Sequence, residues 1–248
     1  MRRSACWRGP AAIIGGAVAN RIALSIIVPV WNEAAGIETA LRRLAPQRAS
    51  GAEVIVVDGG SSDGTAARAR PLADQVVESA RGRAVQMNTG ADHARGSALL
   101  FLHADTVLPA AAGELIMAAL AEHPWGRFDV RLDGAHPILP VVAALMNLRS
   151  RLTGIATGDQ AIFMRRETFA ALGGFAALPL MEDIECCKRL KRIGAPANLR
   201  ARVVTSGRRW EKFGVWRTIF LMWRLRLAYF CGADPDALAR LYQAEPKR

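Results

Sequence analysis

Residues 53–65 read EVIVVDGGSSDGT, and this stretch decides the fold. Its first five residues form a β-branched run typical of a buried strand, which ends at Asp58. A turn rich in glycine and serine follows, and a helix is predicted to begin at Thr65. A strand that passes through a tight turn into a helix is the opening of a β-α-β unit, whose strands run parallel.

The same alternation continues on both sides of this stretch. Strands are predicted at Leu24–Val30, Glu53–Val57, Gln75–Glu78 and Ala98–His103, and helices at Ile37–Leu44, from Thr65, at Arg83–His93 and at Ala111–Glu122. The less regular second half predicts strands at Trp125–Leu132, Ala161–Arg165 and Leu199–Val204, and helices at Ile138–Leu152, Ile184–Ile193 and Phe213–Phe230. This order predicts an α/β protein with a mostly parallel sheet, right-handed crossovers and flanking helices.

The composition narrows the range of partners and compartments. The 248 residues carry a net charge of +11, and 29 of the 33 basic residues are arginine, which favours an anionic partner. Nucleic-acid binding would require the arginines to cluster on one face, but they are dispersed along the chain. A nucleotide is therefore expected as the anionic partner, and a nucleic acid is not. The four cysteines form no CxxC motif, so reduced thiols in a cytoplasmic protein are expected. Residues 1–22 are interpreted as a flexible extension, since their apolar run is marginal for a signal sequence.

Three segments follow predicted strands and should therefore meet at one edge of the sheet: Pro29–Glu33, Asp58–Thr65 and His103–Asp105. The Asp58 carboxylate could accept hydrogen bonds from a base or a ribose, or it could simply cap its own loop. His103 and Asp105 point the same way on an extended segment and could share a ligand. A hard divalent cation bound to a diphosphate needs only one or two protein ligands, although a loop-capping Asp105 is the alternative.

Further polar groups occur in the second half. Glu182 and Asp183 open a helix, where they either cap the helix or supply a general base. Arg208 and Arg209 stand beside Trp210 and either lie on the surface or neutralise a leaving diphosphate. Asp159 and Gln160 precede a predicted strand, and they either lie on the ordinary surface or belong to a binding site.

The order and spacing of these pieces resemble the family 2 glycosyltransferases. The matching segments are IIVPVWNE (26–33), VIVVDGGSSDGT (54–65), GRAVQMNTGADHARGSALLFLHADT (82–106), MED (181–183) and RRW (208–210). The resemblance covers the chain from Leu24 to about Trp210. It implies a GT-A (Rossmann-like) domain over residues 23–210, a nucleotide-diphosphate sugar donor, a divalent metal (Mn²⁺ or Mg²⁺) and inversion at the anomeric carbon.

The resemblance also implies a role for each matched residue. The donor would be bound by Pro29, Asn32, Glu33, Asp58, Arg83, Asn88, Arg209 and Trp210. Asp105, the second acid of the family's DxD motif, would hold the metal, with His103 in the place of the first acid. Asp183 of the ED motif would deprotonate the acceptor, with Glu182 as the next candidate base. Asp159 and Gln160 are assigned to the acceptor.

This sequence departs from the family pattern at three positions. Gly59 replaces the second acid after the strand, His103 replaces the first acid of DxD, and Ser206 replaces the glutamine of QxxRW. Segments such as HADT and LMEDIE also resemble a bacterial subgroup, transferase 2, which is associated with radical-SAM and selenium-domain proteins. That subgroup has been linked to arsenosugar biosynthesis, which implies transfer to a small organoarsenic acceptor.

Residues 211–248 are interpreted as an amphipathic helical extension. Its apolar residues have helical spacing, from Trp216 to Phe230, and arginines interrupt them. This helix packs on the domain, forms a homodimer contact, or lies peripherally on a membrane surface. The alternative functions are a membrane-surface transferase acting on a lipid-linked acceptor, a nucleotidyltransferase, and a non-catalytic relative that binds a nucleotide or an anionic membrane.

Overall fold

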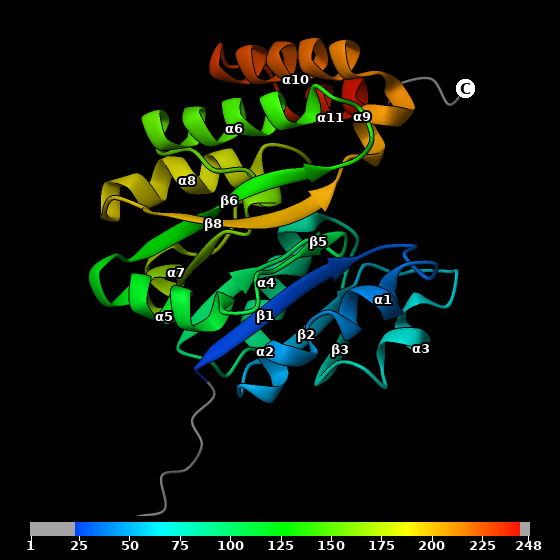
Figure 1. The fold of residues 1–248 in the computed structure, drawn as a ribbon, viewed down its shortest axis with the longest axis vertical. Helices are drawn as coiled ribbons and strands as arrows, with labels where there is room; N and C mark the ends of the chain where they lie inside the picture. Colours follow the sequence, from blue (N-terminus) through cyan, green and yellow to red (C-terminus); the bar gives the residue numbers. More distant parts are fainter. Residues whose placement is uncertain (1–22, 244–248) are drawn as a thin grey trace, which may run out of the picture.

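The computed structural model describes residues 23–243, with the side chains of Arg209 and Gln243 left aside. The extension predicted at residues 1–22 lies outside the described residues. The strands are β1 (Leu24–Val30), β2 (Glu53–Asp58), β3 (Gln75–Glu78), β4 (Ala98–Phe101), β5 (Thr106–Val107), β6 (Trp125–Asp133), β7 (Phe163–Arg165) and β8 (Ala197–Ser206). They form one 8-stranded sheet in the order β3-β2-β1-β4-β7-β6-β8-β5 (Figure 1).

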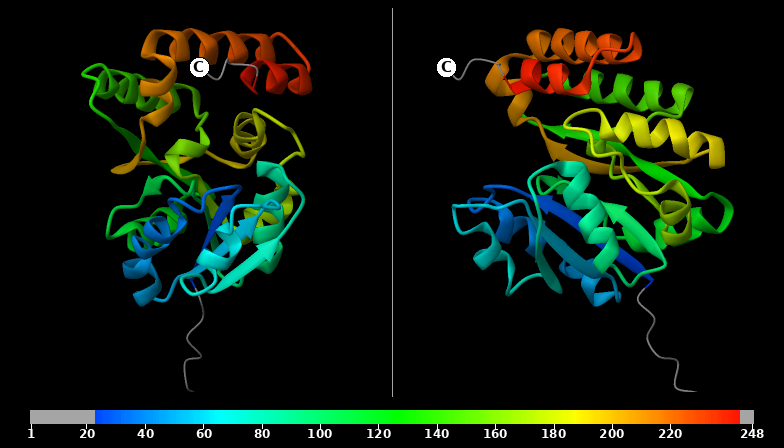
Figure 2. Two further views of the ribbon diagram at one scale, coloured as in Figure 1. Left: turned by 90° about the vertical axis from the view of Figure 1, so that its right-hand side faces the viewer. Right: turned by 180° about the vertical axis from the view of Figure 1, so that it is seen from behind.

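Helices cover both faces of the sheet (Figure 2). Their bounds are α1 (Ile37–Arg42), α2 (Ala45–Ala49), α3 (Thr65–Ala69), α4 (Arg83–His93), α5 (Ala112–Glu122), α6 (Leu139–Thr153), α7 (Arg166–Leu172), α8 (Glu182–Ile193), α9 (Arg208–Phe213), α10 (Val215–Phe230) and α11 (Pro235–Gln243), with a 3₁₀ turn, η1, at Gly158–Gln160. No helix in the described part of the chain is long and apolar enough to cross a membrane.

The first half of the sheet is parallel, as the sequence predicted. β1 pairs in parallel with β2 and β4, and β2 pairs in parallel with β3. β7 then runs antiparallel to both β4 and β6, and the short β5 runs antiparallel to β8. Because β1, β2 and β4 point the same way, the loops after them meet at one edge of the sheet.

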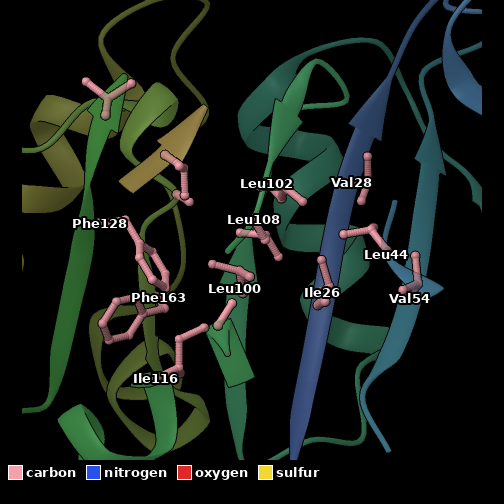
Figure 3. Packing of buried hydrophobic residues seen from close by; sticks show 14 of the residues in the cluster. Ile26, Val28, Leu44, Val54, Leu100, Leu102, Leu108, Ile116, Phe128 and Phe163 are labelled. Carbon is pink, nitrogen blue, oxygen red and sulfur yellow. The ribbon is translucent and has the colours of Figure 1, made fainter. Parts of the chain in front are cut away.

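The core lies on both faces of the sheet because consecutive residues of its central strands, such as Ile26 and Ile27, are apolar and buried. Along β1, Ile26 and Val28 face one apolar cluster, and Ile27 faces the other. Figure 3 shows the first cluster, in which these two side chains meet Val54 and Leu100. The sheet is therefore a rigid support for the loops at its edge.

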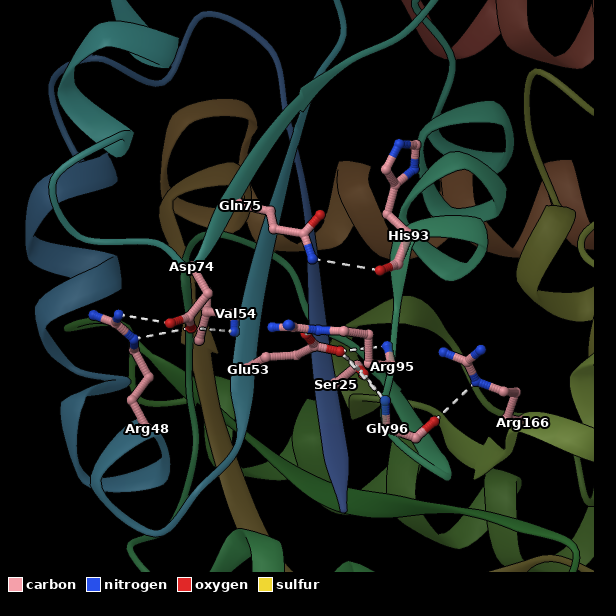
Figure 4. A network of polar contacts seen from close by, with 10 residues as sticks. All are labelled: Ser25, Arg48, Glu53, Val54, Asp74, Gln75, His93, Arg95, Gly96 and Arg166. Atoms are coloured by element: carbon pink, nitrogen blue, oxygen red, sulfur yellow. Dashed lines mark hydrogen bonds and ion pairs between the residues drawn. The ribbon is translucent and has the colours of Figure 1, made fainter. Parts of the chain in front are cut away.

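A buried polar network holds the opposite ends of the strands together (Figure 4). The Glu53 carboxylate accepts hydrogen bonds from Ser25 Oγ and from the backbone and side chain of Arg95. Burial by itself would raise the pKa of Glu53, but these donors outweigh it and lower the pKa. Glu53 is therefore a structural anchor, remote from the edge that carries Asp58.

The structure differs from the predicted elements mainly in the second half. The helix predicted over Phe213–Phe230 begins two residues later, as α10 at Val215, because Gly214, with a φ of +83°, is not helical. Helices α2 and α7 were not predicted, whereas α11 lies within the helical extension predicted over residues 211–248. The α6, α10 and α11 helices gather at the end of the molecule away from β1–β3, at the top of Figure 1.

Candidate functional site

The loops after β1 and β2 are tied to each other by hydrogen bonds. The backbone N–H of Asn32 donates to Ser61 Oγ at 2.8 Å, and Asn32 Oδ1 accepts from the backbone N–H of Ser62 at 2.9 Å. The Glu33 N–H donates to Thr65 Oγ1 at 2.8 Å. The side chain of Asn32, predicted to bind a donor, thus holds the two loops in register.

Asp58 caps the turn that follows it. Its buried carboxylate accepts hydrogen bonds from the backbone N–H of Ser61 at 3.0 Å and from the Ser61 hydroxyl. A Cβ on the neighbouring Gly59 would lie 3.0–3.1 Å from the Gln86 amide. Gln86 Nε2 donates to Val30 O and Val57 O, which pins the ends of β1 and β2. Gln86 therefore occupies the space that a second acid would need.

A rim pocket of about 250 Å³ opens beside these loops. It is lined by Pro29, Val30, Trp31, Glu33, Arg83, Gln86, His103, Ala104 and Asp105. The Arg81 guanidinium carbon stacks 3.5 Å from the ring centroid of Trp31. Burial raises the pKa of Glu33, with nearby Arg208 acting in the opposite direction. Pro29, Glu33 and Arg83 thus line one cavity, and their binding of a donor stays a prediction.

Asn88 lies away from the rim pocket. Its side-chain amide donates to Phe175 O and accepts from the Phe175 N–H, both at 2.9 Å. Asn88 therefore anchors the loop after α7, and its predicted proximity to a donor stays a prediction.

A main pocket of about 260 Å³ lies next to the rim pocket. Its charged lining residues are Arg83, His103, Asp105, Asp159, Glu182, Asp183 and Arg226. Arg83, His103 and Asp105 line both pockets, so the two cavities meet at these side chains. The structure therefore brings Asp105 and Asp183 to one cavity, although they are distant in the sequence.

Asp183 lies in the first turn of α8, two residues after the N-cap Met181, which has a left-handed φ of +69°. Its Oδ2 accepts from the backbone N–H of Gly158 at 2.9 Å, and its Oδ1 accepts from the Ile184 N–H at 2.7 Å. Each oxygen has spare lone pairs after these bonds. The carboxylate is therefore oriented by the backbone and can still accept a proton from a molecule in the main pocket.

Glu182 is more deeply buried than its neighbour. Its side chain is 5% exposed, and its Oε1 lies 3.3 Å from Arg83 Nη1. Burial raises the pKa of Glu182, the Asp183 charge raises it further, and Arg83 opposes both. The ionised form of Glu182 is therefore disfavoured in the folded protein.

Glu182→Gln is expected to change how stability depends on pH. A carboxyl group with a raised folded-state pKa stabilises the fold while it is protonated, and this contribution is lost as the pH rises through the raised pKa. The unfolding free energy of the variant should therefore increase relative to wild type as the pH rises from the ordinary value of 4.5. Urea unfolding across this range measures the difference. Parallel pH curves would contradict the assignment.

His103 turns toward Asp159 rather than toward Asp105. Its Nδ1 lies 3.3 Å from Asp159 Oδ1. Its Nε2 is buried without a hydrogen-bond partner, against Gly158, where a Cβ would collide with the imidazole ring. Burial would raise the pKa of Asp159, but the hydrogen bond and charge of His103, with Arg83 and Arg226, lower it. His103 thus orders η1 beside Asp183.

Asp105 presents an accessible carboxylate where the pockets meet. Its side chain is 37% exposed, its Oδ1 accepts weakly from Thr205 Oγ1 at 3.4 Å, and Arg208 Nη2 lies 4.0 Å from its Oδ2. Among the described residues, no group of three His, Cys, Asp or Glu side chains forms a metal cage. One free carboxylate fits a cation that takes its other ligands from a diphosphate and water. The side chains present therefore fit such a metal through Asp105.

Of the remaining predicted site residues, Trp210 and Asp159 line the main pocket and Gln160 lies in the core. Trp210 lines the main pocket beside Asp105, whereas the side chain of Arg209 lies outside the described part. Gln160 is fully buried, and its Nε2 lies 3.4 Å from Asn147 Oδ1. Its amide also completes a capping box with Thr157. Gln160 thus shapes η1, while Asp159 lines the cavity.

The sequence analysis missed the part of the pocket wall that comes from the C-terminal helices. Thr218, Met222, Leu225 and Arg226 of α10 and Tyr242 of α11 line the main pocket. Their spacing on α10 is helical and places them on the face opposite the apolar residues that begin with Trp216. The helical spacing of these pocket-facing residues was the sequence signal that could have predicted this part of the pocket wall.

Comparison with known proteins assigns this fold to a protein family. Residues 25–169 match the family model of Glycosyl transferase family 2. This match covers more than half of the chain, which therefore belongs to that family.

Two curated glycosyltransferases are similar to the chain. Glycosyltransferase AglE of Haloferax volcanii is 35% identical over 91 residues, which is 33% of this chain and 30% of AglE. An uncharacterized glycosyltransferase of Haemophilus influenzae is 28% identical over 182 residues, covering 67% of this chain and 61% of that protein. The chain thus spans less than two thirds of either relative.

Solved structures confirm the GT-A fold. Mannosyltransferase PcManGT from Pyrobaculum calidifontis, in complex with GDP-Man and Mn²⁺, has a TM-score of 0.62 and 25% identity, over 92% of this chain and 66% of that one. TarS 1–349 of S. aureus, in complex with UDP-GlcNAc, has a TM-score of 0.61 and 20% identity, over 75% and 58% of the two chains. Glucosyl-3-phosphoglycerate synthase of Mycobacterium tuberculosis has a TM-score of 0.56 and 21% identity, over 79% and 77%.

Proposed function

We propose that the protein is an inverting glycosyltransferase that moves a sugar from a nucleotide-diphosphate donor to a hydroxyl of a small-molecule acceptor. The observation that carries this proposal is the joint opening of Asp105 and Asp183 into the main pocket. An inverting transfer needs a group that stabilises the leaving diphosphate and a base on the other side of the anomeric carbon. The two carboxylates supply one candidate for each role.

The rim pocket is the proposed site of the nucleoside. Pro29, Trp31 and Glu33 line it, and the Arg81 guanidinium stacks on the Trp31 ring. Asp58 and Asn32 support this pocket from the adjoining loops, through the hydrogen bonds to Ser61 and Ser62. A flat aromatic wall and a half-buried acid suit a base and a ribose hydroxyl.

The diphosphate is proposed to lie where the rim and main pockets meet. A divalent cation bound there through Asp105 would neutralise the charge of the leaving diphosphate. Arg208 lies beside Asp105, and Trp210 closes the same wall. Arg83 lines both pockets and adds a third positive group. Arg83 and Arg208 would add positive charge beside the leaving group.

Asp183 is the proposed general base. It takes the proton of the acceptor hydroxyl as that oxygen bonds to the anomeric carbon and the bond from this carbon to the phosphate oxygen breaks. The products are the glycoside, a protonated Asp183 and the free nucleoside diphosphate, so atoms and charge balance. Gly158 and Ile184 hold the carboxylate by their backbone N–H groups, which fixes its direction.

The acceptor is proposed to enter on the side of Asp183, past Asp159 and the C-terminal helices. Met222 and Leu225 give this wall apolar surface, and Arg226 adds a cation. The small organoarsenic acceptor implied by the transferase 2 resemblance would bind here. The proposal of this acceptor rests on the sequence motifs alone. Gln160 would contribute indirectly, since it supports η1 from the core.

The proposal is tested by measuring the nucleoside diphosphate released from UDP-, GDP- and dTDP-sugars with and without an acceptor. We expect one donor class to react, and the release to need both Mn²⁺ or Mg²⁺ and a hydroxyl acceptor. Nuclear magnetic resonance of the product should show inverted configuration at the anomeric carbon. Retained configuration would contradict the mechanism, and release that only lipid-linked acceptors stimulate would replace the proposed acceptor class.

A further inference from the structure

The outward face of α10 is a stripe of large apolar side chains. Trp216, Phe220, Trp223, Leu227 and Phe230 are 63%, 67%, 66%, 66% and 56% exposed. Their spacing of three and four residues places them on one side of the helix. The opposite side of α10 is buried, with Val215, Thr218 and Leu225 packed inward. The stripe is therefore an outward surface of a helix that is already docked.

A second stripe lies on α6. Val141, Leu145, Leu148 and Leu152 are 54%, 58%, 50% and 77% exposed. They too recur at helical spacing, while Leu139, Val142 and Ala143 face the core. Both helices lie at the same end of the molecule in each view (Figures 1 and 2). Monomeric soluble proteins seldom expose so many large apolar residues on neighbouring helices, which makes this end of the molecule a candidate docking surface.

The charges on the two helices are all positive. α6 carries Arg149 and Arg151, and α10 carries Arg217, Arg224 and Arg226, with no acidic residue in either helix. Arg217 and Arg224 are exposed at the edge of the α10 stripe. Tryptophan and arginine beside an apolar helix face is the pattern of helices that lie in a membrane interface.

We infer that the α6 and α10 stripes dock on the surface of an anionic phospholipid bilayer. Their apolar side chains would enter the boundary between headgroups and acyl chains, and the exposed Arg217 and Arg224 would meet the lipid phosphates. A second copy of this chain is the less suitable occupant. A two-fold contact through these faces would bring the arginines of both copies together without an acid from either helix. Spanning is excluded for the described helices by their length and polarity.

This surface is separate from the proposed transfer reaction. The pocket residues of α10, such as Met222 and Leu225, lie on its inner side, and the stripe lies on its outer side. A failure of membrane binding would leave the donor and base assignments as they are.

Flotation with lipid vesicles tests the inference. One set of vesicles contains only phosphatidylcholine, and the other contains equal parts of phosphatidylcholine and phosphatidylglycerol. We expect the protein to float with the anionic set and to remain mostly free with the neutral set. Added salt should weaken the binding without abolishing it, because the apolar contribution does not depend on screening.

Two variants and two controls separate the apolar and charged contributions. The double variant Trp216→Gln and Trp223→Gln should lower partition onto anionic vesicles at least about tenfold. Arg217→Gln with Arg224→Gln should lower it about fivefold for each arginine. Met117→Gln and Ile193→Gln change exposed apolar residues outside the stripes, 38% and 46% exposed, and should leave partition unchanged. Because all these side chains are exposed, each variant should unfold at the wild-type temperature.

Two results would overturn the inference. One is equal recovery of wild type and the tryptophan variant with anionic vesicles. The other is a wild-type dimer in analytical ultracentrifugation that the tryptophan variant loses, together with no vesicle binding. The second result would assign the stripes to a contact between two copies of the chain.

Discussion

Asp183→Asn is expected to lower kcat by about 10²–10⁴-fold, the usual contribution of a general base, while the donor binds as in wild type. The substitution keeps the size of the side chain and an oxygen that can accept from the Gly158 N–H. What it removes is the ability to take a proton from the acceptor. Steady-state release of nucleoside diphosphate, together with donor titration, measures the two quantities separately.

The matched control is Glu185→Gln, two residues further along α8. Glu185 pairs with Arg189 at 2.6 Å and does not line the main pocket, so its variant should keep wild-type kcat. A fully active Asp183→Asn enzyme would contradict the role of Asp183. The base would then be sought in Glu182, whose raised pKa makes it the next proton acceptor in the cavity.

Asp129→Ala is expected to destabilise the protein by about 3–5 kcal/mol, because it leaves a buried cation unpaired. The Asp129 carboxylate pairs with Arg127, which is 1% exposed, and with Arg151. Burial lowers the pKa of Arg127, and Asp129 is the group that opposes this effect. The remaining contacts of Arg127 are with the Phe128 and Asn147 carbonyl oxygens.

Urea unfolding gives the loss directly, and an exposed pair provides the comparison. Arg165 and Glu167 are 3.4 Å apart, and the Glu167 side chain is 77% exposed. Glu167→Ala should therefore cost less than about 1 kcal/mol. If Asp129→Ala lowers the free energy of unfolding no more than Glu167→Ala does, the ion pairs of Asp129 with Arg127 and Arg151 do not stabilise the fold.

The first half of the fold could be predicted from sequence because its strands are continuous apolar runs. Residues such as Ile26 and Ile27 are buried on both faces of the sheet, and Asp58 with the two glycines after it marks the end of β2. Short elements gave no such signal. The two residues of β5 and the helix α7 have no period long enough to recognise. Gly214 looked compatible with a continuous helix until its φ was known.

The candidate site was predictable as a set of residues, but the orientation of its side chains was not. Parallel strands placed Pro29, Asp58 and Asp105 at one edge by topology alone. The meeting of Asp105 with Asp183 depends on the path of the chain through β6 to α8, which no local pattern encodes. Whether His103 faces Asp105 or Asp159 depends on the close approach of Gly158, a property of packing.

Donor binding to the wild-type protein and to Asp105→Ala tests the central claim most directly. Thermal unfolding would be followed with UDP-, GDP- and dTDP-sugars, each with Mn²⁺, with Mg²⁺ and with a chelator. A ligand at a hundredfold excess over its Kd stabilises the folded state by about 2.7 kcal/mol. We predict stabilisation by one nucleotide class that needs the metal and disappears in Asp105→Ala. A folded wild-type protein that no donor stabilises, with or without metal, would contradict the account.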